Sequence, residues 1–129
     1  MDYYFNKTFT ESTFENVIEK TTEALKKEGF GILTEIDIKA TFKKKLDVDF
    51  PKYMILGACN PGFAHKALQA ENKIGTMLPC NVIVRETDNG EIEVAAVDPM
   101  ASMMGVENIA LAEIAEEVRS KLKKAVDSL

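Results

Sequence analysis

Two cysteines are the residues of this chain most able to carry chemistry. Cys59 lies in the segment "LGACNPGFAHKAL" and Cys80 in "LPCNVIVRE", and the sequence has no other cysteine. A pair of thiols can act as a redox couple, bind a soft metal ion such as copper or zinc, or serve as two small apolar residues in a core. The residue types leave all three interpretations open.

Cys59 is expected at the point where a buried strand ends and a helix begins. Asn60 is a favoured helix N-cap, and Pro61 is a favoured first helical residue. The free amides and the positive end of the helix dipole favour a thiolate there, and they would also favour an anionic group of a ligand. His65 is the only histidine. It lies in the same helix, where it could act as a base for a thiol, act as a metal ligand, or be an ordinary surface residue.

The direction of two strands decides whether the two sulfurs can meet. Apolar runs predict strands at residues 53–59 and 81–87. In an antiparallel pair, Cys59 at the end of the first strand lies beside Cys80 at the start of the second. If the strands are instead parallel, the two residues lie roughly 20 Å apart, which is too far for a thiol pair. The thiol interpretation therefore depends on a topology that the sequence does not state.

Three methionines share one face of a short helix predicted after Asp98 and Pro99, at Met100, Met103 and Met104. Thioether and thiolate ligands together would select a soft ion such as Cu(I). The commoner role of such a stripe is adaptable packing in a core or at a subunit contact. Because no CxxC or HxxxH pair supports a metal site, we predict no bound metal and no other cofactor.

Composition and charge narrow the class of protein. The 129 residues suit one domain, and 46% of them are hydrophobic and 29% charged, as in soluble globular proteins. A net charge of −5 is unlike the basic surfaces that bind nucleic acid. The segment "MDYYFNKTF" lacks the features of a signal peptide, and the longest apolar run is far shorter than a membrane span. We therefore expect a cytoplasmic protein with neither nucleic-acid nor membrane partners.

Strand and helix signals alternate along the first half of the chain. Aromatic and polar residues alternate over residues 2–9, which predicts a strand. Ser12 and Glu15 form a capping box for an amphipathic helix that Gly29 ends. Asp37 is expected to cap a short helix whose apolar stripe ends at Leu46. The strand before that helix is expected to place four residues on one face: Phe30, Ile32, Thr34 and Ile36.

In the second half of the chain, the pattern predicts a helix that begins at Pro61 and has Leu68 on its inner face. It also predicts a hairpin around the turn "DNG". A long helix follows at residues 106–127, with an apolar side that starts at Ile109. The order is β-α-β-α-β-α-β-β-short α-α in a single domain over residues 1–129. The simplest packing is an α+β fold, in which a mainly antiparallel or mixed sheet is backed by two long amphipathic helices.

Three short motifs resemble those of the domain-of-unknown-function 302 family of bacterial and archaeal proteins. They are Cys59-Asn60-Pro61, the run Leu78-Pro79-Cys80-Asn81-Val82, and Asp98-Pro99 followed by Met103. The resemblance covers essentially the whole chain. It implies a compact α+β domain that generally forms a homodimer, and it supplies no reaction. Its motif residues gather in the region of the two cysteines, which implies a shared pocket there.

No conventional catalytic apparatus is evident, because GxGxxG, GxxxxGK[ST], HExxH and GxSxG are all missing. We therefore expect a homodimeric ligand-binding or regulatory module. Its dimer surface is expected at exposed apolar positions of the segment that carries Met100, Met103 and Met104, which we call the methionine turn. Two alternatives remain, namely a thiol-based redox protein and a soft-metal (copper or zinc) protein. The candidate ligand-binding residues are Asn60, Pro61, Asn81, Asp98 and Met103. The candidate catalytic residues are Cys59, Cys80 and His65.

Overall fold

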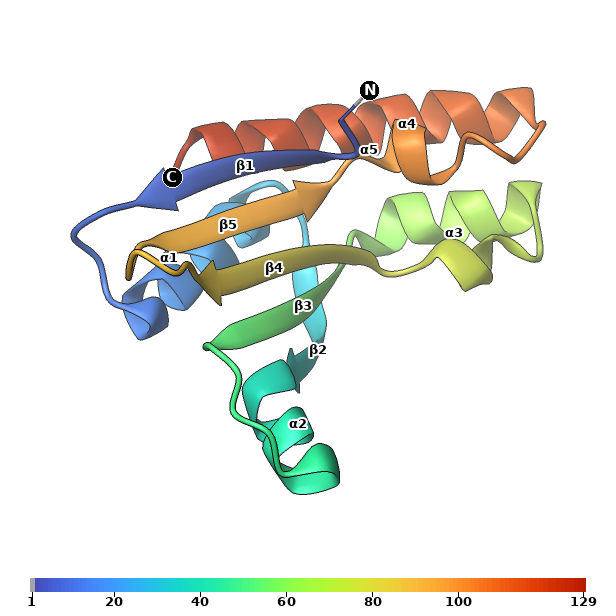
Figure 1. Ribbon diagram of the computed structural model, residues 1–129. Helices are drawn as coiled ribbons and strands as arrows, with labels where there is room; N and C mark the ends of the chain where they lie inside the picture. Colours follow the sequence, from blue (N-terminus) through green and yellow to red (C-terminus); the bar gives the residue numbers. More distant parts are fainter. Residues whose placement is uncertain (1) are drawn as a thin grey trace.

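The computed structural model describes residues 2–129 and places strands and helices in the predicted order (Figure 1). The elements are β1 (Tyr4–Phe9), α1 (Phe14–Lys27), β2 (Gly31–Asp37), α2 (Ile38–Leu46), β3 (Tyr53–Cys59), α3 (Pro61–Ala70), the 3₁₀ turn η1 (Ile74–Met77), β4 (Cys80–Glu86), β5 (Ile92–Val97), α4 (Pro99–Ser102) and α5 (Ile109–Asp127). The α+β class predicted from the sequence is confirmed.

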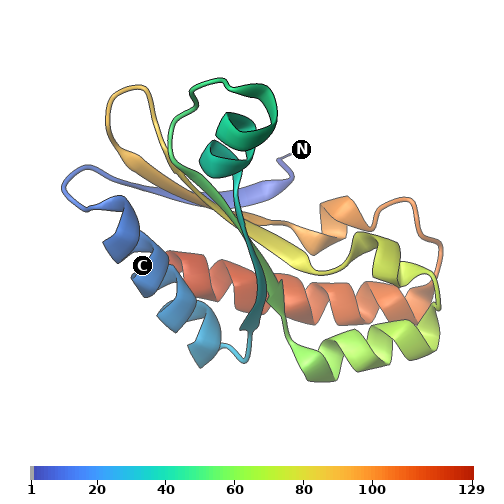
Figure 2. The ribbon, with the colours of Figure 1, turned by 90° about the horizontal axis from the view of Figure 1, so that it is seen from below.

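The five strands form one sheet in the order β1-β5-β4-β3-β2, and every neighbouring pair is antiparallel. Helices α1, α3 and α5 lie on one side of this sheet, whereas α2 lies on the other side (Figure 2). Because α2 follows the edge strand β2, it leaves the opposite end of that face without a helix. The sheet therefore has one covered face and one partly open face.

The main core lies between the sheet and helices α1 and α5. Burial alternates along strands β4 and β5. Every second side chain lies beneath the helices, and four of these are fully buried, namely Val82, Val84, Val94 and Ala96. Leu25 and Leu122 fill the helical side and are almost completely buried. Each such aliphatic side chain stabilises the fold by about 1.5–3 kcal/mol through its removal from water.

Helix boundaries follow short-range capping signals. The Asp37 carboxylate accepts a hydrogen bond of 2.9 Å from the Ala40 amide, and Gly29 has a φ of +88° after α1, as predicted. The predicted cap at Ser12 is wrong by one residue. Thr13 is the N-cap of α1, and its hydroxyl accepts a hydrogen bond from the Asn16 amide. Adjacent serine and threonine residues offer equivalent hydroxyls, so only the backbone geometry selects between them.

Strand β2 departs from the predicted alternation. Ile32 pairs with Ala58 but Thr34 pairs with Gly57, so that one extra residue, Leu33, lies in β2. Consequently Ile32 and Thr34 face opposite sides of the sheet, and the prediction of one shared face was wrong. Some predicted inner positions are also on the surface; in α2 this is because the helix lies across the sheet from the core and buries none of its residues (Figure 2). These positions are Leu46, Leu68 and Ile109, with exposed fractions of 65%, 44% and 83%.

We expect the substitution Thr21→Val to stabilise the protein by about 1–2 kcal/mol, which would raise Tm by roughly 3–8 °C. Thr21 is 2% exposed, and its hydroxyl has no hydrogen-bond partner within residues 2–129. Valine keeps the shape and removes the unsatisfied hydroxyl. Chemical denaturation would measure the change, with Thr22→Val, a half-buried neighbour on α1, as the control. An equal gain in both variants would contradict this account of Thr21.

Candidate functional site

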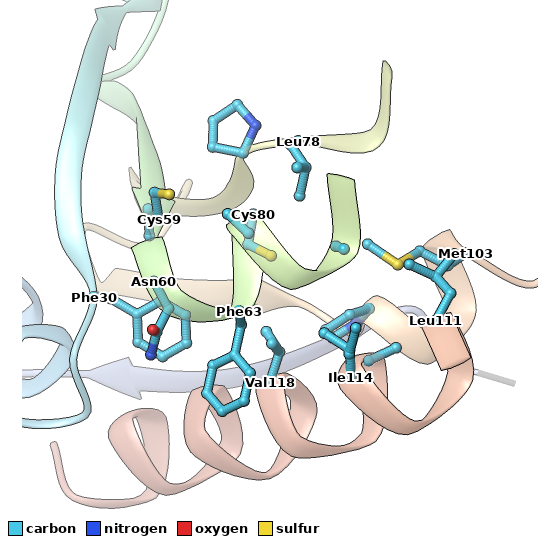
Figure 3. A pocket seen from close by; sticks show the side chains of 16 residues that line it. Phe30, Cys59, Asn60, Phe63, Leu78, Cys80, Met103, Leu111, Ile114 and Val118 are labelled. Carbon is cyan, nitrogen blue, oxygen red and sulfur yellow. The ribbon is translucent and has the colours of Figure 1, made fainter. Parts of the chain in front are cut away.

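The two cysteines lie at the same end of an antiparallel strand pair. Ala58 is directly opposite Cys80 in the β3–β4 register, so Cys59 and Cys80 are diagonal neighbours across the two strands. Both thiols are free and both line one apolar cavity between the sheet, α3 and α5. Figure 3 shows them at one end of this cavity, with Met103 and Leu111 toward the other. We call it the thiol cavity.

The thiol cavity is small and apolar. Its volume is about 40 Å³, whereas sites for small organic ligands usually have about 300–1,000 Å³. Phe30, Phe63 and Val118 are among its lining residues, and Cys80 is only 8% exposed. The thiol cavity is therefore a site of side-chain packing in this structure, with room for little more than one or two water molecules.

Burial dominates the chemistry of Cys80. Desolvation, and to a smaller extent the nearby Cys59, raises the pKa of Cys80 to about 11 from an ordinary value of 9.0. At neutral pH the Cys80 side chain is consequently a neutral thiol. A thiol of this kind is a weak nucleophile, and it must lose its proton before it can ligate a metal ion as a thiolate.

We expect the raised pKa of Cys80 to make the folded state less stable between pH 9 and pH 11. Below pH 9 the folded and unfolded chains both hold the proton. Above it, unfolded chains lose the proton while folded chains keep it up to about pH 11, so that the free energy of unfolding falls by about 2–3 kcal/mol across this interval. The comparison is with Cys80→Ala in urea denaturation at each pH, because tyrosines and lysines titrate equally in both proteins. Parallel pH curves for the two proteins would contradict the prediction.

The other predicted site residues are distributed over several surroundings. Met103 lines the thiol cavity, as does Asn60, but His65 and Pro61 are exposed on α3 and do not line it. Asn60 occupies the N-cap position of α3 without a side-chain capping bond. Its amide nitrogen instead donates a hydrogen bond of 3.3 Å to the carbonyl oxygen of Glu28, which ties the start of α3 to the end of α1.

Asp98 is 4% exposed, and both of its carboxylate oxygens are engaged. One oxygen accepts a hydrogen bond of 3.0 Å from the Met100 amide and thereby caps α4. The other lies 3.1 Å from Nε of Arg119 on α5. The guanidinium of Arg119 in turn lies over the Phe5 ring, 5.1 Å from its centroid. Asp98 therefore holds α4, α5 and β1 together.

The open face of the sheet carries a larger depression, which we call the sheet-face basin. Its volume is about 560 Å³. Ile83, Ala95 and Val97 belong to its lining, and Asn81 is the one predicted site residue that lines it. The remaining residues of the lining are Tyr3, Tyr4, Tyr53, Arg85, Glu93 and the backbone of Ala96, whose side chain is buried on the other face of the sheet.

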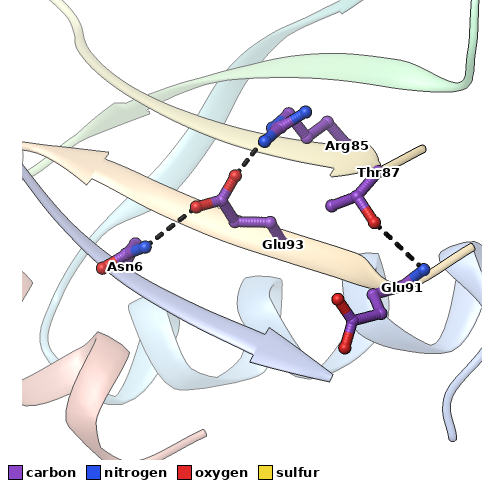
Figure 4. Close-up of polar contacts among 5 residues, drawn as sticks. All are labelled: Asn6, Arg85, Thr87, Glu91 and Glu93. Carbon is purple, nitrogen blue, oxygen red and sulfur yellow. Dashed lines mark hydrogen bonds and ion pairs between the residues drawn. The ribbon is translucent and has the colours of Figure 1, made fainter. Parts of the chain in front are cut away.

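A charged cluster occupies one end of the sheet-face basin (Figure 4). The Glu93 carboxylate accepts a hydrogen bond of 2.6 Å from Nε of Arg85 and one of 2.8 Å from the side-chain amide nitrogen of Asn6. Burial acts to raise the pKa of Glu93, but the bonds from Asn6 and Arg85 and the charge of Arg85 outweigh it, so that the pKa is lowered. Glu93 is consequently ionised at neutral pH and holds the Arg85 guanidinium in place.

Sequence reasoning missed most of the sheet-face basin. The signal that could have indicated part of it is the hairpin, because Arg85 and Glu93 are equally distant from the "DNG" turn and are direct partners in the β4–β5 register. No sequence signal connects Tyr3 and Tyr53 with that pair. The strand order β1-β5-β4-β3 brings these residues to one face.

The antiparallel five-stranded sheet, with three helices on one face, defines an α+β domain. The chain belongs to the family described as domain of unknown function DUF302, whose model matches residues 5–129, and the resemblance noted in the motifs is thereby confirmed. A similar solved structure is that of an uncharacterized conserved DUF302 protein from Bacillus stearothermophilus. It is 26% identical in sequence, the match covers 98% of each chain, and the TM-score is 0.90.

No curated protein matches the chain. Within residues 2–129, no helix has the length and apolar character needed to cross a membrane. The same part of the chain holds no group of three or more histidine, cysteine, aspartate or glutamate side chains suited to a metal ion. A soft-metal site built on Cys59, Cys80 and a methionine thioether stays a prediction.

Proposed function

We propose that this protein is a ligand-binding module without conventional catalytic apparatus, and that its ligand lies in the sheet-face basin. One observation carries the proposal. The basin, at about 560 Å³, is within the usual size range of small-molecule sites, whereas the thiol cavity is more than tenfold smaller. A site on the rigid strands of a sheet would also need little reorganisation when a ligand binds.

The lining of the basin supports the same proposal. Binding sites for small molecules usually combine an apolar surface with a few polar groups that fix the orientation of the ligand. Here Ile83 and Ala95 supply apolar surface, while Asn81 and Arg85 supply donors on the same strand face. The tyrosines add aromatic surface that can pack against a ligand.

A thermal-shift screen of a small-molecule library tests this proposal. The wild-type protein is compared with Ile83→Gln, which places an amide in the basin, and with Ile109→Gln, an equivalent change at an exposed position of α5. We expect at least one compound to raise Tm in the wild type and in Ile109→Gln but not in Ile83→Gln. An equal shift in all three proteins, or no shift with any compound, would contradict the proposal.

We further propose that the protein is a homodimer. Large apolar side chains are exposed on β2, on α2 and in the loop after it, which together form the β2–α2 surface: Leu33, Ile36, Leu46, Val48 and Phe50. Strand β2 is also an edge of the sheet, and an edge strand offers unpaired backbone groups to a second chain. Helix α2 projects from the sheet beside this edge (Figure 1).

Analytical ultracentrifugation tests both the dimer and its surface. We expect Ile36→Glu to shift the protein to the monomer, because a charge on an apolar interface is costly to bury. Met104→Glu is the matched control on the methionine turn, where Met104 is 66% exposed. Dissociation by Met104→Glu alone would move the interface to the methionine turn. A monomer at all concentrations of wild type would contradict the homodimer.

A thiol-based redox function is the second candidate, and the position of both cysteines at one end of β3 and β4 favours it. The raised pKa of Cys80 makes Cys59 the only suitable attacking thiol. Native alkylation followed over pH tests this function. Fast reaction at Cys59 that is lost in Cys59→Ser would support it, whereas two thiols that react only after unfolding would exclude it.

A further inference from the structure

The Arg85 guanidinium is held in a fixed position at one end of the sheet-face basin. Its Nε donates the 2.6 Å hydrogen bond to Glu93, and the two other guanidinium nitrogens have no hydrogen-bond partner within residues 2–129. The side chain is 41% exposed, so these nitrogens are open to solvent or to a ligand. An arginine oriented in this way presents two donors in a fixed fork.

Glu93 leaves no corresponding place for a cation. Its two carboxylate oxygens accept from Arg85 and from Asn6, and its side chain is only 16% exposed. The lowered pKa of Glu93 keeps this arrangement intact at neutral pH. The charged groups still available at this end of the basin are therefore the Arg85 nitrogens. Tyr53, the partner of Arg85 on β3, has a hydroxyl that can donate as well as accept, and the complementary ligand group is an anionic acceptor.

The opposite end of the basin is aromatic and apolar. Tyr4 pairs with Val97, whereas Arg85 pairs with Glu93, so the two ends are four residues apart along β5, or about 13 Å. The rings of Tyr3 and Tyr4 meet edge to face, with centroids 5.0 Å apart. This pair offers a ring face or edge to an apolar or aromatic group.

We propose that the sheet-face basin binds an elongated, largely apolar molecule with one terminal anionic group, a carboxylate, sulfonate or phosphate. The anionic group lies at the Nη atoms of Arg85, the middle of the molecule lies on Ile83 and Ala95, and the apolar end lies at Tyr3 and Tyr4. This inference rests on the proposed ligand-binding function and adds the chemical class of the ligand.

Two fluorescent probes that differ mainly by one anionic group test the inference. The first is 1-anilinonaphthalene-8-sulfonate, and the second is its uncharged counterpart N-phenyl-1-naphthylamine. We expect the wild type to bind the sulfonate about tenfold more tightly than the uncharged probe, and Arg85→Gln to remove that preference. Arg85→Lys keeps the charge without the fork and should restore only part of it. Lys26→Gln, an exposed lysine of α1, is the matched control for loss of one positive charge.

The outcomes separate the ligand class from the proposed function. If Ile83→Gln abolishes binding of both probes while Arg85→Gln changes neither, the basin binds ligands but the anionic class is wrong. If neither probe binds the wild type, or if Ile83→Gln leaves both unaffected, the ligand-binding function of the basin itself fails. If Ile83→Gln instead converts a dimer to a monomer, a second copy of the chain occupies the basin and the inference is overturned. Circular dichroism verifies that each variant is folded.

Discussion

Replacing Gly57 by alanine is expected to destabilise the protein by about 2–3 kcal/mol, an unusually large effect for one added methyl group. A Cβ at this position would lie 2.8 Å from Cγ of Pro79 and would overlap Oγ1 of Thr34. Both contacts are closer than any relaxed one. The Thr34 side chain can rotate, because it lies on an exposed edge strand, whereas the Pro79 ring cannot move without its backbone.

Urea denaturation of matched variants tests the role of Gly57. Gly31→Ala is the control in the same sheet, because no atom lies within 4 Å of its added Cβ and its φ is not positive. We expect that variant to change stability by no more than about 0.5 kcal/mol. Adding Gly57→Ala to a Thr34→Ala background should cost less than in the wild type but still more than 1 kcal/mol, because Pro79 remains. A cost equal to that of Gly31→Ala would contradict the steric account.

The second large effect is expected at Asp98. Asp98→Ala removes the cap of α4 and the partner of Arg119, and we expect a loss of about 2–4 kcal/mol. The cap alone contributes about 1 kcal/mol. The remainder is smaller than for a fully buried pair, because the Arg119 side chain is 35% exposed and keeps contact with water. Thermal and urea unfolding would measure the loss.

Asp98→Asn separates the two contributions. Asparagine keeps an oxygen for the Met100 amide but removes the charge facing Arg119, so we expect about half of the alanine effect. Lys123→Ala breaks an exposed ion pair with Asp127 and should cost well under 1 kcal/mol. Equal losses for Asp98→Asn and Lys123→Ala would show that the Asp98–Arg119 pair contributes no more than a surface contact.

Signals that act over a few residues predicted most of the fold. Gly29, Asp37 and the "DNG" turn each constrain the backbone locally, so the sequence alone located a helix end, a helix start and a hairpin. The bulge in β2 was not predictable in the same way. A bulge at a residue such as Leu33 has no signature in the amino-acid types of the strand. It can be recognised only from the pairing of β2 with β3. The exposure of Ile109, the first residue of α5, likewise depends on tertiary packing rather than on residue type.

The candidate sites were predictable to different degrees. Cys59 and Cys80 were recognisable as candidate site residues from their residue type. Their proximity, however, depended on the antiparallel direction of β3 and β4. That their cavity is too small for an organic ligand follows from packing, which no motif records. The sheet-face basin is built from common residues, such as Tyr53 and Arg85, which carry no distinctive spacing and gather only through the strand order.

The strand order also has a consequence for biosynthesis. Strands β2 to β5 are neighbours in the sheet in the order in which they are made, but β1 pairs only with β5, at residues 92–97. Within this sheet, the strand that is made first is therefore the last to find its partner. Until residue 97 has emerged, residues 4–9 have no edge to join, and their aromatic side chains remain accessible to chaperones and proteases.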